Sequence, residues 1–244
     1  MEVTKHIHFE KIDSTNTWAK QHSDQWDLKG MTLVTAAEQS GGRGRFNRKW
    51  VSPANLNIYA TFCFWYSLER NDVGHIPQML AIAASKSLEN QGFFPQLKWP
   101  NDILLSGKKV GGILCETIVE GTKRGVICGI GLNVNMPLDI LQLIDRPATS
   151  LCVEGGRSFE VSNVLETLKQ CFVENMDLFL KGGFDQFFSY FQEKSSFKKG
   201  DEVRFHDNQI IVEANFVSLH PDGSVELRLR NGMLKKYYAG EFIA

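Results

Sequence analysis

The spacing of hydrophobic and polar residues predicts helices and strands along most of the chain. Apolar residues recur every three or four positions through residues 161–180, which is typical of an amphipathic helix. Residues 56–64 alternate and are rich in aromatic side chains, as in a strand. Pro77 suits the first turn of a helix, and Gly92 suits the residue just beyond its end. The predicted helices cover residues 13–21, 76–91, 161–180 and 184–194, and the predicted strands cover residues 31–37, 56–64, 96–99, 103–106, 109–119 and 125–134.

The pattern changes near residue 196, where we place a domain boundary. Beyond it the predicted strands are short and are separated by Pro-Asp-Gly and Asn-Gly turn sequences, which favours a small β-barrel. Before it the connections between strands are too short for crossover helices, so we expect an α+β domain with a mixed or antiparallel central sheet. The expected domains are residues 1–195 and 196–244. The predicted strands of the second cover residues 202–205, 210–219, 224–230 and 234–238.

Composition narrows the class of protein. Hydrophobic residues make up 43% of the chain and charged residues 23%, which is typical of a folded protein and not of a disordered one. The polar N-terminus has no apolar signal core, and no apolar run is long enough to span a bilayer, so we expect a cytoplasmic protein without membrane contact. The formal net charge of −1 opposes a broad electrostatic contact with nucleic acid.

Five cysteines occur, which is an odd number, at wide spacings and without a C-x-x-C pair. This argues against a disulfide framework or a zinc site. Most of the cysteines have apolar neighbours in the sequence, so we interpret them as small buried side chains.

Residues 39–50, Gln-Ser-Gly-Gly-Arg-Gly-Arg-Phe-Asn-Arg-Lys-Trp, combine glycines with cations. Glycines let backbone N–H groups approach an anion, and arginine supplies forked donors for phosphate or carboxylate. The spacing matches neither a Walker loop nor a dinucleotide-binding fingerprint. The alternative is a solvated flexible loop, but the density of cations favours an anion site. The interior Phe46-Asn47 has no interpretation from the sequence.

Three further segments carry polar groups suited to a ligand. Trp-Pro-Asn-Asp at residues 99–102 would place an amide and a carboxylate on a turn, able to contact a ligand or a Mg²⁺ ion held mainly by phosphates. Glycines at 129 and 131 would bare one strand face for a flat ligand, with Asn133 beside it. The helix start at residues 13–17, capped by Asp13 or Ser14, would present free N–H groups. Taken singly, each has a structural alternative: a self-bonded turn, a strand thinned for packing, and a simple helix cap.

Together, and in this order, these segments resemble the biotin protein ligase family (biotin–acetyl-CoA-carboxylase ligase). The resemblance covers nearly the whole chain. It also includes Lys109, which taken alone would be read as a snorkelling surface residue. The matching pieces are Ser-Thr-Asn at 14–16, Gln39 with Gly-Arg-Gly-Arg at 42–45, Arg-Lys-Trp at 48–50, Lys-Trp-Pro-Asn-Asp at 98–102, Lys109 with Gly-Ile-Leu at 112–114, Gly-x-Gly-x-Asn at 129–133, and Gly-Glu-Phe at 240–242.

The resemblance implies the class II aminoacyl-tRNA synthetase-like catalytic fold of biotin ligases, followed by a small SH3-like β-barrel. It implies an ATP- and Mg²⁺-dependent ligase that forms biotinyl-5′-AMP and transfers biotin to a lysine of a biotin carboxyl carrier protein. Arg43 and Lys109 match catalytic positions, and no protein ligand to the metal is assigned. Positions that bind biotin are matched by Ser14, Thr15, Asn16, Gln39, Arg43, Gly44, Arg45, Lys109 and Gly112. Positions on the ATP side are matched by Arg43, Arg45, Trp50, Asn101, Asp102 and Asn133.

Two other functions compete with this interpretation. A lipoate or octanoate ligase or transferase shares the general fold, but the full Gly-Arg-Gly-Arg loop and the C-terminal barrel oppose it. A nucleic-acid-binding module is opposed by the net charge. Some family members carry an N-terminal DNA-binding domain, for which the position of the Ser-Thr-Asn motif leaves no room, so we expect a short form without operator binding. Family members occur as monomers or as dimers, so the resemblance allows a homodimer.

Overall fold

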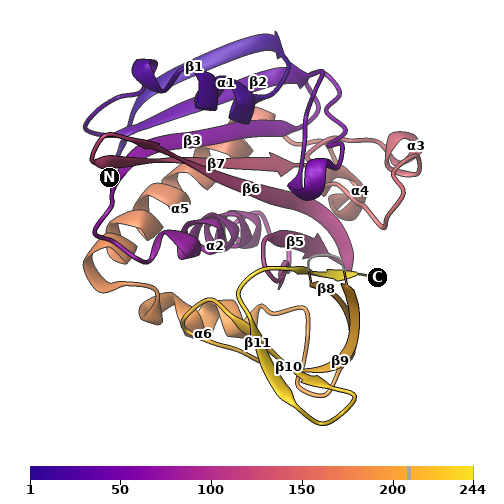
Figure 1. Cartoon of the computed structure of the whole chain (residues 1–244). Helices are drawn as coiled ribbons and strands as arrows, with labels where there is room; N and C mark the ends of the chain where they lie inside the picture. The colour runs from indigo at the N-terminus through magenta and orange to yellow at the C-terminus, as the bar shows by residue number, and fades with distance from the viewer. Residues whose placement is uncertain (208–209, 244) are drawn as a thin grey trace.

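A seven-stranded mixed sheet forms the centre of the computed structural model, which describes residues 1–207 and 210–243 (Figure 1). The strand order is β1-β2-β3-β7-β6-β5-β4. β1 and β2 run parallel, and every other neighbouring pair is antiparallel. The predicted mixed sheet is therefore confirmed. Its strands are β1 (Val3–Ile12), β2 (Met31–Gln39), β3 (Ile58–Ser67), β4 (Gln96–Lys98), β5 (Asp102–Leu105), β6 (Lys108–Glu120) and β7 (Lys123–Leu132).

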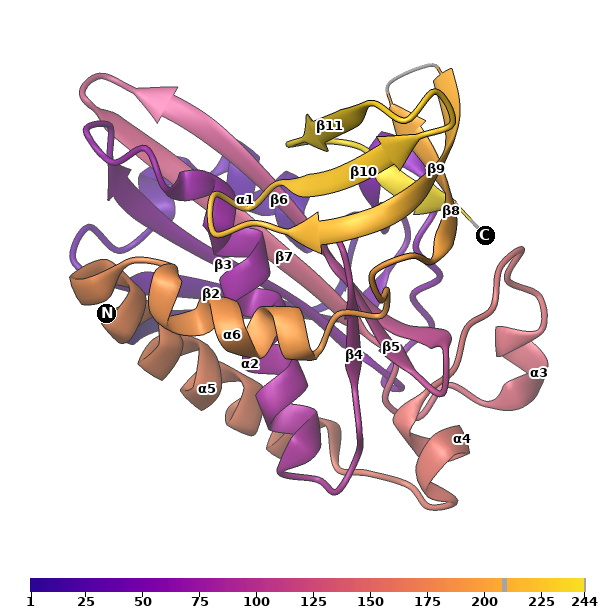
Figure 2. The same ribbon diagram turned by 90° about the horizontal axis from the view of Figure 1, so that it is seen from below.

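Helices cover both faces of this sheet. The long helices α2 (Ile76–Glu89) and α5 (Val161–Gly182) pack on one face, and α1 (Thr15–Gln21) packs against β2, β3 and β7 on the other (Figure 1). Seen from below, α6 (Asp185–Glu193) lies beside α2 and α5 (Figure 2). Because β3 lies between two covered faces, nearly every one of its residues is buried. The short helices α3 (Leu138–Leu141) and α4 (Leu151–Gly155) follow β7.

The ends of the helices follow the expected local chemistry. Ser14 is the N-cap of α1, and its hydroxyl accepts from the Thr17 N–H at 3.5 Å, which settles the choice between Asp13 and Ser14. Pro77 lies in the first turn of α2, where no backbone N–H is needed. Gly92 follows α2 with φ of +87°, a conformation that suits a residue without Cβ.

The C-terminal segment forms a second, antiparallel sheet in the order β11-β10-β9-β8-β12. The four strands predicted here are present, and β12 is an additional one. No pairing joins β11 to β12 within the described residues, so closure into an SH3-like barrel stays a prediction. Its strands are β8 (Glu202–Asp207), β9 (Ile210–Leu219), β10 (Val225–Leu229), β11 (Leu234–Tyr237) and β12 (Glu241–Ile243).

Trp99, in the turn between β4 and β5, joins the two sheets. Its ring lies 5.9 Å from that of Phe205 and 6.1 Å from that of Phe242, measured between ring centres. Its indole N–H donates to the Gly223 carbonyl at 2.9 Å. One hydrophobic cluster therefore extends from the large sheet into the C-terminal sheet. As a result, the turn that contains Trp99 is held by strands β4 and β5 of the large sheet and by the C-terminal sheet.

All five cysteines are free thiols, and Cys63 and Cys128 are fully buried. Within residues 1–207 and 210–243, none of the helices combines the length and apolar character needed to cross a bilayer.

Candidate active site

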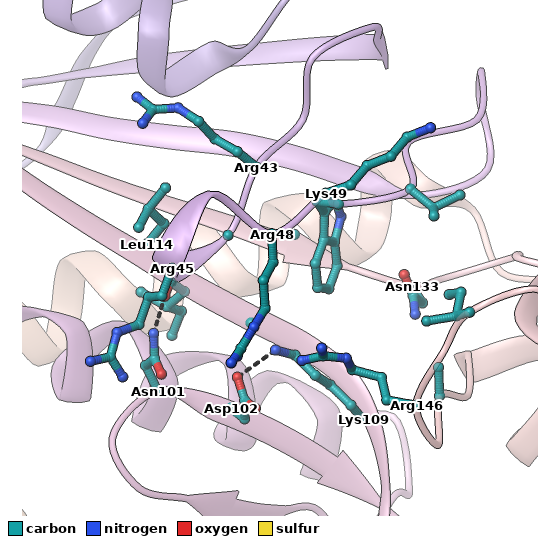
Figure 3. A pocket seen from close by; sticks show the side chains of 18 of the residues that line it. Arg43, Arg45, Arg48, Lys49, Asn101, Asp102, Lys109, Leu114, Asn133 and Arg146 are labelled. Atoms are coloured by element: carbon teal, nitrogen blue, oxygen red, sulfur yellow. Dashed lines mark hydrogen bonds and ion pairs between the residues drawn. The ribbon is translucent and has the colours of Figure 1, made fainter. Parts of the chain in front are cut away.

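A cavity of about 710 Å³ lies at the end of the large sheet where β2 and β7 finish and β6 begins (Figure 3). This volume is within the range of small-molecule sites. Its walls also include the start of α1, the turn between β4 and β5, strand β12, and part of residues 41–50, here called the arginine loop. Every site residue expected from the sequence lines this one cavity: Ser14, Thr15, Asn16, Gln39, Arg43, Gly44, Arg45, Trp50, Asn101, Asp102, Lys109, Gly112 and Asn133.

One end of the cavity is a network of neutral polar groups, which we call the head end. The Thr15 hydroxyl donates to Gln39 Oε1 at 3.2 Å, and the Thr15 backbone N–H donates to the same oxygen at 2.9 Å. Behind them, the Thr61 hydroxyl lies 2.8 Å from Thr15 Oγ1 and 2.7 Å from Asn16 Oδ1. Thr15, Asn16 and Thr61 are almost fully buried. These amides and hydroxyls are held in fixed positions and suit an uncharged polar ligand group.

Glycines in β7 make room for two side chains of the cavity. A Cβ on Gly129 would lie 2.0 Å from Asn16 Oδ1, and one on Gly131 would lie 2.3 Å from the Trp50 ring. The sequence interpretation left this strand face open for a flat ligand. In the structure, the Asn16 amide and the Trp50 indole lie on it instead, and they form the surface that a ligand would meet. The indole Nε1 of Trp50 is buried against Gly131 and has no hydrogen-bond partner among the described residues.

Lys109, on β6, has its ammonium inside the cavity rather than on the surface. Its Nζ lies 2.5 Å from Asp102 Oδ1 and 5.5 Å from the centre of the Trp50 ring (Figure 3). A Cβ on Gly112 would lie 2.9 Å from Lys109 Nζ, so this glycine provides the space for the lysine. Only 21% of the lysine side chain is exposed. This position contradicts the snorkelling alternative.

The two asparagines on the expected ATP side are already engaged by backbone. Asn101 donates to the Ile113 carbonyl, and the Ile113 N–H donates back to the Asn101 carbonyl at 3.1 Å. Asn133 is 3% exposed, and its Nδ2 donates to the Thr149 carbonyl at 2.9 Å. Its amide therefore holds the segment after α3 against the sheet, and the donor that the sequence interpretation offered to a ligand is in use.

The arginine loop is anchored to the C-terminal sheet. Arg45 donates to the Gly240 carbonyl at 2.9 Å, and Arg48 forms two hydrogen bonds with the Glu241 carboxylate, one of them at 2.6 Å. Between these arginines, Phe46 and Asn47 have φ of 56° and 55°. Non-glycine residues adopt this left-handed region at some cost, so the Phe46-Asn47 interior makes the reversal that brings both arginines to β12.

This anchor shifts the pKa of its members. Burial acts to raise the pKa of Glu241, but the hydrogen bond and charge of Arg48 outweigh it, and the pKa lies below the ordinary value. The same hydrogen bond raises the pKa of Arg48. Burial lowers the pKa of Arg45, partly offset by the charge of Glu241. Both arginines remain charged at neutral pH because their ordinary pKa is so high.

Arg43 lies apart from this anchor. Its Nη2 donates to the Glu116 carboxylate at 3.1 Å, and Figure 3 shows its side chain directed away from Asp102 and Lys109. Arg43, Lys109 and Asn133 nevertheless line one shared cavity, as the sequence interpretation requires.

Comparison with known proteins identifies the family. The model of the Biotin/lipoate A/B protein ligase family matches residues 8–133. The chain belongs to this family. It is 32% identical to a biotin–[acetyl-CoA-carboxylase] ligase of Paracoccus denitrificans over 66% of this chain and 69% of that protein. It is also 32% identical to the bifunctional ligase/repressor BirA of Bacillus subtilis, over 73% of this chain and 55% of that protein, so the match spans little more than half of the relative.

Among solved structures, this member of the family resembles the biotin protein ligase of Aquifex aeolicus in complex with biotin and ATP. The TM-score is 0.81 at 29% identity, over 98% of both chains. The catalytic fold that the resemblance implied is therefore confirmed.

The sequence did not single out several charged residues that line the cavity of this family member. Lys98 belongs to the Lys-Trp-Pro-Asn-Asp motif, in which a role was predicted only for Asn101 and Asp102. Burial lowers the pKa of Lys98, and the charge of Asp102 partly offsets this. Arg146 stands in a segment without a motif. Arg48 and Glu241 belonged to quoted motifs, and only their opposite charges hinted that they pair. These additional charged lining residues are Arg48, Lys49, Lys98, Asp145, Arg146 and Glu241.

A site for Mg²⁺ was implied by the resemblance. Within the described ranges, no group of three or more His, Cys, Asp or Glu side chains is arranged to hold a metal ion. Mg²⁺, however, is commonly held by one or two carboxylates together with substrate phosphates and water. Asp102 and Asp145 line the cavity, so the residues present fit an ion held in that way.

Proposed function

We propose that this protein is an ATP-dependent biotin–protein ligase, which activates biotin as biotinyl-5′-AMP and transfers it to a lysine of a biotin carboxyl carrier domain. One observation carries the proposal. A neutral polar head end and a cluster of cations, contributed by separate stretches of the chain, share one cavity. The names of the relatives and the solved complex with biotin and ATP support the same activity.

The head end suits the ureido ring of biotin. That ring carries two N–H donors and one carbonyl acceptor and no charge, and the groups of Thr15, Asn16 and Gln39, which are bonded to one another and to their neighbours, include both donors and acceptors. We propose that Ser14, Thr15, Asn16 and Gln39 hold the ring, so that the valeryl chain leads toward Lys109 and Gly112. The ring would thereby fix the distance from the head end to the reacting carboxylate.

The first step brings a carboxylate to a triphosphate, so negative charges must be offset before they can react. A carboxylate oxygen of biotin attacks the α-phosphorus of ATP, and the bond to the bridging oxygen of the β-phosphate breaks, releasing pyrophosphate. Lys109 and Arg45 would stabilise charge on the carboxylate and on the α-phosphate, and Arg43 would join them. Trp50, Asn101, Asp102 and Asn133 would form the nucleotide side of the cavity. Mg²⁺, held by the phosphates and Asp102, would supply further charge neutralisation.

The second step needs no nucleophile from this chain. The neutral amine of an acceptor lysine attacks the carbonyl carbon of the acyl-adenylate, the bond from that carbon to the phosphate oxygen breaks, and AMP leaves as the amide forms. The mixed anhydride must be protected from water until then. The arginine loop, anchored to β12, is placed to cover it. We propose that residues 196–244 form a separate domain that supports this cover.

Incubation with biotin, ATP labelled at the α-phosphate, and Mg²⁺ tests the proposal. We expect labelled biotinyl-5′-AMP and unlabelled pyrophosphate only when biotin is present, and labelled AMP together with biotinylated carrier once a carrier domain is added. Parallel calorimetric titrations with biotin and lipoate provide the control for substrate class. Binding of lipoate in the micromolar range without binding of biotin would overturn the proposal in favour of a lipoate ligase.

A further inference from the structure

Glu116, on β6, contacts three side chains beside the head end of the cavity. Its carboxylate accepts from Arg43 Nη2 at 3.1 Å, from Asn16 Nδ2 at 3.2 Å and from Lys20 Nζ at 3.3 Å. The Glu116 side chain is only 17% exposed, whereas half of the Lys20 side chain is in solvent. Glu116 thus connects a residue of the head end to a cation of the arginine loop.

This contact determines where the charge of Arg43 acts. The guanidinium is directed away from Asp102 and Lys109 (Figure 3). Its Nη2 lies 3.1 Å from Glu116 Oε2. The Lys109 ammonium is also paired, with Asp102, but it lies inside the cavity, whereas Arg43 is both paired with a carboxylate and directed away from that part of the cavity, so its N–H groups do not face an anion bound beside Lys109. For Arg43 to act on a carboxylate or phosphate in the cavity, it has to exchange partners.

The surroundings of Glu116 make this exchange feasible. If Arg43 leaves, Glu116 keeps Lys20 and Asn16, so its carboxylate is not left buried and unpaired. Arg43 itself is 31% exposed, so its side chain has room to move. By contrast, Arg45 and Arg48 are bonded to Gly240 and Glu241 in the C-terminal segment. Arg43 instead pairs with Glu116 on β6 of the large sheet.

We propose that Glu116 is a positioning residue that holds Arg43 at the rim of the empty cavity, and that the anionic end of the ligand draws Arg43 away from Glu116 on binding. The inference rests on the proposed function, because the carboxylate of biotin and later the acyl-phosphate are the anions that take Arg43. Glu116 therefore lowers the affinity for an anionic ligand without touching it.

Calorimetric titration of the whole chain with biotin and with the uncharged biotin amide tests the exchange. Glu116→Gln keeps the shape of the side chain and removes its charge. We expect it to bind biotin about 3- to 10-fold more tightly, roughly the difference between a charge-assisted and a neutral hydrogen bond to Arg43, and to bind the amide with nearly unchanged affinity. With Arg43→Ala already in place, the selective gain for biotin should vanish. Glu120→Gln, which removes the same charge farther along β6, should leave the ratio of the two affinities unchanged.

Three outcomes would overturn the inference. Equal weakening of both ligands in Glu116→Gln would mean that Glu116 only supports Asn16. A gain for biotin that persists without Arg43, or that also occurs in Glu120→Gln, would be a general effect of removing negative charge. If Glu116→Gln fails to fold, Glu116→Asp retracts the carboxylate but keeps its charge, and it should raise the ratio of biotin to amide affinity in the same direction. Absence of biotin binding by the unmodified protein would instead refute the proposed function.

Discussion

Arg48 and Glu241, which are 193 residues apart in sequence, form a two-point ion pair between the arginine loop and strand β12. The Glu241 side chain is only 15% exposed, so solvent screens the pair weakly. Together with the bond from Arg45 to the Gly240 carbonyl, the pair makes the C-terminal sheet part of the cavity wall. The loop that bears the cations is thus held by the last strand of the chain.

Removing the charge of Glu241 should impair the enzyme through the loop. Glu241→Gln replaces charge-assisted hydrogen bonds with neutral ones, a loss of about 1–2 kcal/mol, so we expect kcat/KM for adenylate formation to fall about 10-fold. Biotin-dependent pyrophosphate release measures this. Glu213→Gln, which removes a surface pair with Arg230 in the same sheet, is the matched control and should behave as the unmodified protein. Equal activity of both variants would mean that the anchor does not support the loop.

Elements with strong periodic patterns could be predicted from the sequence, whereas weakly patterned ones could not. Helix α5 and strand β3 were expected within a few residues of their observed ends, because burial on a defined face imposes a clear pattern. Strand β1 was not expected. It lies at the edge of the sheet, and six of its ten residues are exposed, so its sequence is mostly polar. The short elements α3, α4 and β12 offer too few residues for any period to appear.

For the site, the sequence predicted which residues line the cavity better than it predicted which of them bond to each other. The residues expected to line the cavity do so, because each lies in a short motif with recognisable chemistry. The ion pair between Arg43 and Glu116 spans 73 residues, and that between Arg48 and Glu241 spans 193. Such pairs depend on strand order, and no local pattern encodes strand order. The engagement of Asn133 by the Thr149 carbonyl was missed for the same reason.

Lys109 should be essential to the first step. Lys109→Ala removes the cation that lies beside Asp102 in the cavity, and we expect adenylate formation to slow about 100- to 1,000-fold, as when one preorganised charge donor is lost. Far-UV circular dichroism should be unchanged. Lys108→Ala, at the exposed neighbouring position, is the control and should retain full turnover. Normal turnover of Lys109→Ala would refute a catalytic role.

Substitutions at Gly129 and Gly131 of β7 should affect the binding of biotin and of ATP separately. Gly131→Ala would push against the Trp50 indole, so we expect the Kd for ATP to rise at least about 10-fold, while biotin binding changes little. Gly129→Ala would push against Asn16, and we expect the reverse pattern. Separate titrations with each ligand measure both constants. Gly74→Ala, where a Cβ would meet nothing within 4 Å, should leave both unchanged. Loss of both ligands in both variants would show a general defect of the strand instead.

Asp222 should make stability depend on pH in the acid range. Burial acts to raise its pKa, but hydrogen bonds from Ser224 and Tyr238 and the charge of Lys236 lower the pKa to about 2. The folded carboxyl therefore binds a proton less readily than the unfolded one, so the stabilisation is complete above about pH 4 and is lost as pH falls toward 2. Asp222→Asn should lower Tm by about 1–3 °C at pH 7, a small effect because the side chain is solvated, and the difference should disappear near pH 2.

Thermal unfolding followed by circular dichroism at pH 7, 4, 3 and 2.5 measures this difference. Asp24→Asn, at an exposed position outside the turn, is the control and should match the unmodified protein at each pH. A Tm difference for Asp222→Asn that stays constant from pH 7 to 2.5 would contradict the linkage, because a change that removes only packing or a neutral hydrogen bond does not titrate. A difference that closes with acid would assign the effect to the carboxylate, which lies beside the Gly223 carbonyl that Trp99 uses to hold the C-terminal sheet.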